Sequence, residues 1–426
     1  MPSSSPSSSP SPSSSPLLVL ISPMDQETRG HLLESVARDH RIWLFSDREV
    51  GWEAPFITGH TRVDTLDADG MTEAVAEALP VAPDAILCWD ETRILPAAKV
   101  AGALGLPGLS PEAVLTCRDK HLTRLAVARA GGPQARSTPV STLTEAHEAA
   151  AETGYPVVVK PRALVGSTGT RMARTPEELA AVFPAIRGTT MVEVRERFER
   201  PVLIEEYLDG PEISVDALIW DGEVTPLFVA RKELSPPPNF EEVGHCVDAA
   251  DPLLADPELL RALTTVHAAV GITRGWTHSE WRLTARGPAL VEVNARSGGD
   301  FISYLGLLAT GWDAGLAAAR LSLGQRPEQG VARSGAAAVR FLYPEVETVV
   351  GRVTIDRDRL PAGIGIARVV ARPGHVLELP PASHTGRYAM LVASGDTAED
   401  CRATLDAAED AVLLEAAEPV QVPAPR

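Results

Sequence analysis

Short apolar runs alternate with amphipathic stretches over the first quarter of the chain. The continuous run Leu-Leu-Val-Leu-Ile at residues 17–21 is typical of a buried parallel strand. The pattern predicts strands at residues 17–21, 42–45 and 85–89, and helices at residues 30–39 and 71–79. This alternation favours an α/β layer domain with a parallel sheet. No Gly-rich fingerprint follows the first strand, so a dinucleotide site is not expected there.

The rest of the chain mixes helical and strand patterns and becomes richer in strands after Gly335. Helices are expected at about residues 118–130, 144–152, 176–183, 257–270, 312–323 and 397–414, and strands at residues 157–160, 202–208, 213–220 and 224–230. The last helix begins with Thr-Ala-Glu-Asp, close to a capping box. The fold class is therefore α/β and α+β, with a parallel N-terminal part and a β-rich C-terminal part.

Residues 278–296 predict a β-hairpin that turns at Ala-Arg-Gly, residues 285–287. A hairpin centred on Arg286 places Glu280 directly across from Glu292. Because side chains alternate across a strand, Asn294 joins Glu292 on one face, while residues 291 and 293 are expected on the other.

Like charges that face each other across a sheet destabilise it unless a cation lies between them. Glu280, Glu292 and Asn294 offer hard oxygen ligands suited to Mg²⁺, which commonly binds through one or two carboxylates and substrate phosphates. The alternative is a pair of solvated glutamates on an exposed face, and the hairpin alone does not choose between the two.

Composition sets the broad class. The 426 residues predict two to four domains, and 44% hydrophobic with 23% charged residues is typical of a soluble globular protein. A net charge of -18 argues against nucleic acid or an anionic membrane as the main partner. The four scattered cysteines indicate neither a zinc site nor a disulfide framework, which favours the reducing cytoplasm. Residues 1–16 are almost wholly Ser and Pro and are expected to be a disordered tail, not a secretory signal.

Two lysines are candidate phosphate ligands. Lys160 ends the strand Val-Val-Val-Lys and precedes a loop that contains Gly166, Ser167 and Gly169, whose backbone N–H groups could cradle phosphate oxygens. The loop does not match the P-loop pattern. Lys120 stands near the start of a helix. An ordinary surface loop and a solvated lysine are the alternatives for these two segments.

Three further groups are candidate ligands for a nucleotide or a substrate. Backbone groups of Glu205, Glu206, Tyr207 and Leu208 could meet an adenine edge, and Glu212 could accept from ribose hydroxyls. Arg296 continues the face of Glu292 and could bind a phosphoryl or carboxylate group bidentately, and Gly298 and Gly299 would allow close approach of a ligand. Glu242 and His245 are a third, weaker candidate pair, because a lone histidine is more often structural.

Taken in order, these segments resemble the ATP-grasp superfamily over roughly residues 116–320. Cys-Arg-Asp-Lys at residues 117–120 is similar to the first nucleotide-lysine segment of the family, and residues 155–161 are similar to its second lysine strand. The sequence Val-Glu-Val-Asn-Ala-Arg at residues 291–296 is the most specific motif. The resemblance implies ATP ligation by Lys120, Lys160, Gly166, Ser167, Gly169, Glu205, Glu206, Tyr207, Leu208 and Glu212, Mg²⁺ (or Mn²⁺) ligation by Glu280, Glu292 and Asn294, and catalysis by Arg296 and Lys160.

Within the superfamily the chain looks most like the L-amino-acid ligases and related carboxylate–amine ligases. That resemblance implies amide formation through an acyl phosphate, with Glu242, His245, Arg296, Gly298 and Gly299 near the substrate. The loop at residues 163–169 lacks the poly-Gly run of biotin carboxylases. The residues after Arg296 are Ser-Gly-Gly-Asp, without the acidic/His pattern that biotin carboxylases have there. Both departures argue against a carboxylase, which stays an alternative together with a non-catalytic nucleotide-binding sensor.

The expected organisation is a tail at residues 1–16, an N-terminal α/β domain at 17–115, an ATP-grasp domain with a lid at 116–325 and a β-rich C-terminal domain at 326–426. The expected partners are small-molecule carboxylates and amines, with no nucleic acid and no membrane, and a homodimer is compatible with the sequence. The composition is also compatible with specialised peptide metabolism such as antibiotic biosynthesis.

Overall fold

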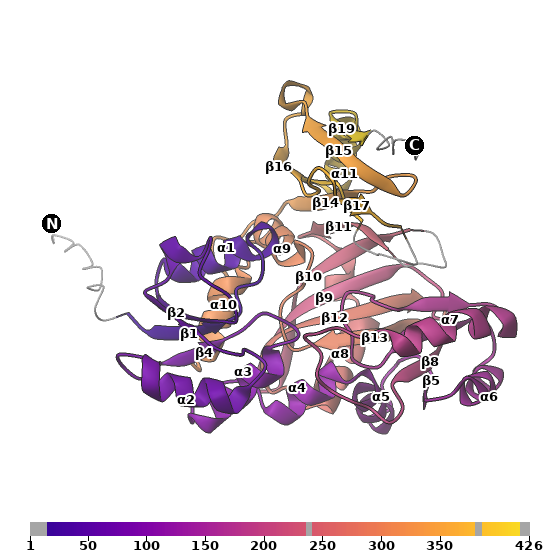
Figure 1. Cartoon of the computed structure of the whole chain (residues 1–426), viewed down its shortest axis with the longest axis horizontal. Coiled ribbons are helices and arrows are strands. Elements are labelled where there is room, and N and C mark those ends of the chain that lie inside the picture. Colours follow the sequence, from indigo (N-terminus) through magenta and orange to yellow (C-terminus); the bar gives the residue numbers. More distant parts are fainter. Residues whose placement is uncertain (1–14, 236–240, 380–385, 418–426) are drawn as a thin grey trace, which may run out of the picture.

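The computed structural model describes residues 15–235, 241–379 and 386–417. The predicted Ser/Pro tail lies outside the described residues, apart from its last two positions. The chain forms an N-terminal α/β part, a small lid sheet and a large antiparallel sheet that runs into the C-terminal part (Figure 1).

The N-terminal part is a parallel sheet in the order β3-β2-β1-β4, as the alternating pattern predicts. All five residues of the first strand are buried. The elements of this part are β1 (Leu17–Ile21), α1 (Gln26–Ala37), β2 (Arg41–Ser46), the 3₁₀ turn η1 (Ala54–Phe56), β3 (Gly59–Arg62), α2 (Ala68–Ala78), β4 (Ala85–Leu87) and α3 (Ile94–Ala103). The carboxyl end of β4 leads directly into Asp90 and Glu91, which are buried.

A second four-stranded sheet has the order β5-β8-β6-β7, and two helices pack on it. We call this layer the lid sheet. Its elements, with the two helices that precede it, are α4 (Pro111–Arg118), α5 (Lys120–Arg129), β5 (Ser137–Val140), α6 (Leu143–Thr153), β6 (Val157–Pro161), β7 (Arg171–Ala173), α7 (Pro176–Gly188) and β8 (Val202–Glu206). The helix predicted at about residues 118–130 is confirmed as α5, whose first turn is capped by the Asp119 side chain. The short helix before it, α4, was not predicted.

The large sheet has the order β13-β12-β9-β10-β11-β14-β18-β16, and all of its described pairings are antiparallel. Its strands are β9 (Glu212–Trp220), β10 (Glu223–Leu234), β11 (Glu242–Asp248), β12 (Arg274–Thr284), β13 (Gly287–Asn294), β14 (Ala336–Leu342), β16 (Ile364–Val369) and β18 (Ala389–Gly395). Three of these strands follow residue 325, so the sheet continues across the expected domain boundary, and the boundaries themselves stay predictions.

The remaining elements cover this sheet or extend beyond it. They are η2 (Pro252–Ala255), α8 (Pro257–Val270), α9 (Ile302–Thr310), α10 (Ala314–Ser322), β15 (Thr348–Ile355), η3 (Arg357–Arg359), β17 (Val376–Leu377), α11 (Ala398–Glu409) and β19 (Val412–Ala416). The expectation that the last helix runs to residue 414 is wrong. It ends at Glu409, and the next residues pair with β15 in a separate small sheet.

Both faces of the large sheet are buried. Leu218 and Phe228 pack with α9, α10 and the N-terminal sheet, whereas Ile219 and Val229 pack with α8. Neighbouring residues enter opposite cores because side chains alternate across a strand. This double burial holds the polar residues of the sheet in fixed positions.

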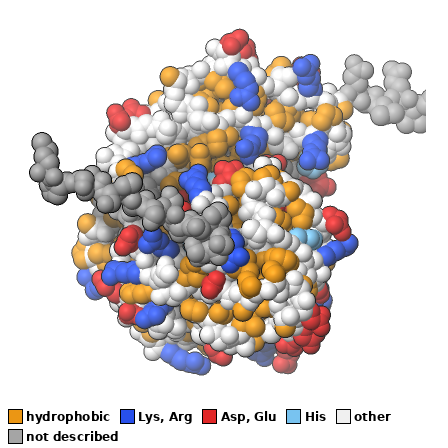
Figure 2. Space-filling model, turned by 90° about the vertical axis from the view of Figure 1, so that its left-hand side faces the viewer, with side chains coloured by type: hydrophobic (Ala, Val, Ile, Leu, Met, Phe, Trp, Pro, Cys, Tyr) orange, Lys and Arg blue, Asp and Glu red, His pale blue; other side chains and the backbone are white. Residues whose placement is uncertain are grey.

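Acidic and basic side chains are interspersed on the face shown in Figure 2, so this side of the molecule carries no field of a single sign. In the described part of the chain, no helix is long and apolar enough to cross a membrane.

Candidate active site

The hairpin forms as predicted, and Glu280 pairs directly with Glu292. The register then shifts, so that Trp281 pairs with Leu290 and Val291 is the extra residue of a β-bulge. The expectation that Val291 points away from Glu292 is wrong, because the bulge turns Val291 toward the same cavity. Val293 does enter the opposite core, with Leu290.

Each of the two facing carboxylates has its own protein cation. Lys232 Nζ lies 2.9 Å from Glu280 Oε1, and Lys120 Nζ lies 3.1 Å from Glu292 Oε2. Both glutamate side chains are 21% exposed, which excludes the alternative of a freely solvated pair. The charges of Lys232 and His278 outweigh the opposing effect of burial and hold the pKa of Glu280 well below its usual range.

The residues around Glu292 fit a divalent cation. The Asn294 amide nitrogen, turned toward the carboxylates, donates to Glu292 at 3.0 Å and to Glu91 at 3.2 Å. Rotation of the amide by half a turn would present its oxygen beside those carboxylate oxygens, which is the donor set that Mg²⁺ prefers. The chemistry of these side chains is therefore compatible with the expected metal.

A cationic cluster lies on the lid side of the cavity. The single carboxylate of Glu205 receives a bidentate pair from Arg124, at 2.8 and 3.0 Å, and contacts Lys160 Nζ at 2.7 Å. Burial raises the pKa of Glu205, but these two cations outweigh it and hold the pKa at about 2. Burial lowers the pKa of Lys160, and the charges of Arg124 and Lys120 add to this. Two cations thus share one buried anion, which leaves positive charge available for a bound anion.

Lys120 is buried rather than solvated. Its Nζ donates to the Leu164 carbonyl at 2.8 Å in addition to its ion pair with Glu292. Gly166 and Ser167 of the same loop line the cavity, whereas Gly169 does not. Gly169 has a φ of 74°, and a Cβ there would lie 2.9 Å from Pro161 Cγ, so a glycine is needed for local packing.

A buried lysine that the sequence patterns did not single out joins three expected residues. Lys232 on β10 lies 3.1 Å from Glu212, 2.9 Å from Glu242 and 2.9 Å from Glu280. Its burial lowers the pKa of the amine, but the three carboxylates outweigh that effect and raise the pKa well above its ordinary value. No clear signal for it exists in the sequence, because Lys232 stands between an arginine and a glutamate at the polar end of β10. Arg282 adds a second cation, 2.7 Å from Glu212.

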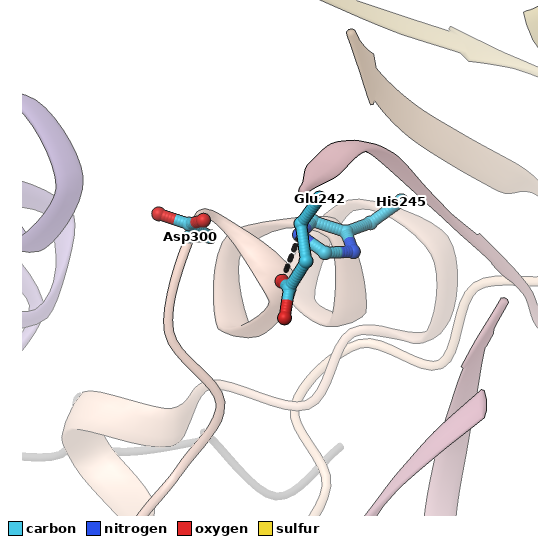
Figure 3. Close-up of side chains that lie close together, drawn as sticks. All are labelled: Glu242, His245 and Asp300. Atoms are coloured by element: carbon cyan, nitrogen blue, oxygen red, sulfur yellow. Dashed lines mark ion pairs between the residues drawn. The ribbon is translucent and has the colours of Figure 1, made fainter. Parts of the chain in front are cut away.

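Glu242, His245 and Asp300 form a second acidic group, in which ligand atoms of the three residues lie within 4.8 Å of one another. Figure 3 shows the Glu242 carboxylate facing the His245 ring and Asp300 on a separate loop. His245 Nε2 lies 3.2 Å from Glu242 Oε2. Each carboxylate already has a partner, Lys232 for Glu242 and Arg387 for Asp300.

Arg296 meets a residue from the N-terminal domain. Its Nε lies 2.8 Å from Glu91, which also contacts Arg118 at 3.2 Å. Glu91 was missed, although polar residues after the carboxyl end of a parallel strand commonly face a ligand. Arg29 and Arg387 were also missed, and they reach the cavity from α1 and from the segment before β18.

One cavity of about 530 Å³ brings these groups together. Every residue singled out for the site lines it except Gly169, His245 and Gly298. Gly298 is needed for packing, because a Cβ at this position would lie 2.7 Å from Ile302 Cγ2. The cavity therefore combines a cationic side, an acidic side and an arginine from each flanking domain.

Comparison with known protein families gives a match to the ATP-grasp domain at residues 153–304, the segment that carries Lys160, Lys232 and the Glu280–Glu292 hairpin. The chain therefore carries an ATP-grasp domain at residues 153–304. It also has the ATP-grasp fold, with a parallel N-terminal sheet and antiparallel central and C-terminal sheets.

Individual relatives are distant. Over 256 residues the chain is 29% identical to an alanine–anticapsin ligase of Bacillus subtilis, an alignment that covers 56% of this chain and 54% of that ligase. The chain thus spans about half the length of this ATP-grasp relative. Among solved structures, an L-amino acid ligase from Bacillus licheniformis has a TM-score of 0.78 at 21% identity, covering 95% of this chain and 99% of that one.

The biotin carboxylase domain of a Hydrogenobacter thermophilus 2-oxoglutarate carboxylase, solved with MgADP and bicarbonate, has a TM-score of 0.67 at 18% identity. That comparison covers 94% of this chain and 91% of the carboxylase domain. Ligases and carboxylases therefore share the ATP-grasp fold, and the fold alone does not choose between them.

Proposed function

We propose that this chain is an ATP-dependent carboxylate–amine ligase that joins amino acids or similar substrates through an acyl phosphate. The observation that carries the proposal is the placement of Arg296 in the cavity that the Glu280–Glu292 pair and Lys160 also line. The strand β13 thus carries two of the three expected metal ligands, Glu292 and Asn294, and leads to a guanidinium suited to an acyl phosphate. The sequence relationship to an alanine–anticapsin ligase supports this choice of reaction.

The cationic side of the cavity is suited to the phosphates of ATP. Among the described residues, Lys120, Lys160 and Arg124 pair with two carboxylates, Glu205 and Glu292, so the three cations exceed their partners by one charge. Gly166 and Ser167 would add backbone N–H groups to the phosphates. The backbone of residues 206–208 would hold the adenine, and Glu212 the ribose.

Glu280, Glu292 and Asn294 would hold Mg²⁺ or Mn²⁺. When bound, the metal offsets the negative charge of the phosphates during transfer. Lys232 pairs with Glu280 and Lys120 pairs with Glu292, so each of the two carboxylates lies beside a cation of the protein.

The reaction has two steps. A carboxylate oxygen of the acid attacks the γ-phosphorus of ATP, the bond to the β-phosphate oxygen breaks, and an acyl phosphate and ADP form. An amine then attacks the acyl carbon, the acyl–phosphate bond breaks, and the amide and inorganic phosphate leave with loss of a proton from nitrogen. Arg296 stabilises the negative charge that develops in the transition state. The loop at residues 163–169 excludes water from the acyl phosphate.

The acidic group of Glu242, His245 and Asp300 is suited to a substrate ammonium. An α-ammonium carries the charge and the donors that the carboxylates of Glu242 and Asp300 can accept, and both residues line the cavity. His245 contacts Glu242 at 3.2 Å without lining the cavity itself.

The test is to incubate the purified chain with ATP, Mg²⁺ and pooled amino acids, to measure phosphate release and to search for new amides by mass spectrometry. A parallel incubation contains bicarbonate in place of the amino acids. Amide formation with phosphate release supports the ligase. Phosphate release only with bicarbonate would instead favour a carboxylase, and intact ATP binding without phosphate release from any pool would favour a sensor.

A further inference from the structure

Arg29 brings a guanidinium from α1 into the cavity at the glycines that follow Arg296. The residue is only 4% exposed, yet it lines the cavity. Its Nη1 donates to the Gly298 carbonyl at 2.9 Å. Its Nη2 lies 3.7 Å from the position that a Cβ on Gly299 would occupy, so the missing side chain leaves space beside that nitrogen.

This guanidinium has no acidic partner. Within residues 15–235, 241–379 and 386–417, Arg29 forms no ion pair. The carboxylates that act on Arg29 are engaged elsewhere: Asp300 pairs with Arg387 at 2.7 Å, Asp216 pairs with His278 at 2.7 Å, and Asp25 accepts from Thr28 at the start of α1. Burial lowers the pKa of Arg29 to about 10, and the positive charge of Arg296 adds to this.

A buried charge without a counterion is costly, and a protein rarely keeps one unless a ligand supplies the opposite charge. The planar guanidinium lines the cavity, and its fork of N–H groups matches a carboxylate. Arg29 reaches the cavity from α1 beside Gly298, whereas Lys160 reaches it from β6 beside Glu205. An anion at Arg29 would therefore be a different group from a phosphate held by Lys160.

We propose that Arg29 binds a substrate carboxylate that stays ionised throughout the reaction. This proposal rests on the proposed ligase function and adds a substrate class to it: one of the two substrates carries a carboxylate in addition to any that is phosphorylated. That carboxylate belongs either to the amine substrate, as in an α-amino acid, or to a dicarboxylic acid substrate. Both sources present the same chemistry to Arg29.

The first experiment measures binding rather than turnover. Each of the twenty common L-amino acids and its amide is titrated against the full chain, with Mg²⁺ and a non-hydrolysable ATP analogue present, and the rise in melting temperature is recorded. We expect at least one amino acid to bind about 10- to 100-fold more tightly than its amide, the size of a charge-assisted hydrogen-bonded pair. Arg29→Met should remove most of this preference, and Arg29→Lys should keep part of it.

Arg340→Met is the matched control, because it removes a half-buried arginine that pairs with Asp406 outside the cavity. It should leave the preference for the carboxylate unchanged. The proposal is overturned if the wild-type chain binds amides as well as amino acids, or if a folded Arg29→Met variant keeps the full preference.

A second experiment identifies which substrate carries the carboxylate. Hydroxylamine replaces the amine substrate and converts an acyl phosphate to a hydroxamate, so this assay needs only ATP and the acid. If KM for the acid rises in Arg29→Met in this assay, the carboxylate belongs to the acid. If hydroxamate formation is unchanged but KM for the amine rises about 10- to 100-fold in the complete reaction, it belongs to the amine substrate.

The two experiments separate this proposal from the proposed function. If binding prefers carboxylates through Arg29 but no hydroxamate or amide forms with any acid, the ligase assignment fails and the anion site stands. If hydroxamate and amide form with unchanged KM values in Arg29→Met, the ligase stands and the Arg29 site fails.

Discussion

Lys232 Nζ lies 2.9 Å from Glu280 Oε1, so a buried ammonium on β10 holds one member of the facing glutamate pair. The same ammonium contacts Glu212 and Glu242. One side chain therefore joins the residues proposed for ribose, metal and amine binding. Removal of this lysine would affect all three at once.

Lys232→Met should destabilise the fold by about 3–5 kcal/mol, because it leaves three carboxylates without their shared buried cation. Chemical denaturation measures the loss. Added Mg²⁺ should raise the melting temperature of this variant more than that of the wild type, since the carboxylates then lack a competing ammonium. Lys99→Met, on the exposed face of α3, is the control. A change in stability below about 1 kcal/mol would contradict the central role of Lys232.

Glu292→Gln should abolish turnover with little loss of folding, because the amide keeps the shape of the side chain but cannot replace a carboxylate as a ligand. We expect kcat to fall by about 100-fold or more, the scale reported for lost electrostatic stabilisation in active sites. Phosphate release and a thermal melt measure the two effects. Glu77→Gln changes an exposed glutamate on α2 in the same way and should be neutral. Retained activity at ordinary Mg²⁺ would refute the metal assignment.

Glu205 predicts a specific acid dependence of stability. Its folded pKa of about 2 lies below the ordinary value of 4.5, so its ion pairs stabilise the fold fully above pH 4.5 and are lost as the pH falls toward 2. The shift corresponds to about 3 kcal/mol. The difference in free energy of unfolding between wild type and Glu205→Gln should therefore shrink by about this amount between pH 6 and pH 2.5. A constant difference across this range would show that Glu205 gains no net stability from Arg124 and Lys160.

The two glycines after Arg296 should respond differently to alanine. A Cβ at Gly298 would lie 2.7 Å from Ile302 Cγ2 and 3.0 Å from His278 Nδ1, so Gly298→Ala should cost about 1–3 kcal/mol of stability. At Gly299 the nearest contact, 3.7 Å to Arg29 Nη2, is an ordinary one, so Gly299→Ala should fold normally. Urea denaturation of both variants checks this. Equal stabilities would show that the backbone can move to accept a side chain at Gly298.

The fold was predictable where the local pattern is strong. The helix expected at residues 257–270 has those bounds, and the three predicted N-terminal strands form one parallel sheet. Residues 410–414 were assigned to a helix because an amphipathic pattern runs on from α11. In the structure Val412 and the residues after it pair with β15, and such a distant partner leaves no local signal.

The site divides in the same way. The sequence was sufficient to single out the two lysine segments, the facing glutamates and Arg296 as candidates. A strand or a hairpin fixes the direction of its own side chains, so its local pattern carries this information. Val291 was misplaced because a β-bulge depends on how two strands match along their length, which neither strand shows alone.

By itself, the sequence determined the N-terminal strands and the pairing of Glu280 with Glu292, because these follow from periodicity and from one tight turn, and its motifs carry the resemblance to the ATP-grasp superfamily. Only the tertiary structure decided the counterions of that pair and brought Arg29, Glu91 and Arg387 to the same cavity. Ion pairs between residues far apart in the chain have no characteristic spacing. They exist because the packing of the sheets buries these charges together and leaves them little water with which to interact.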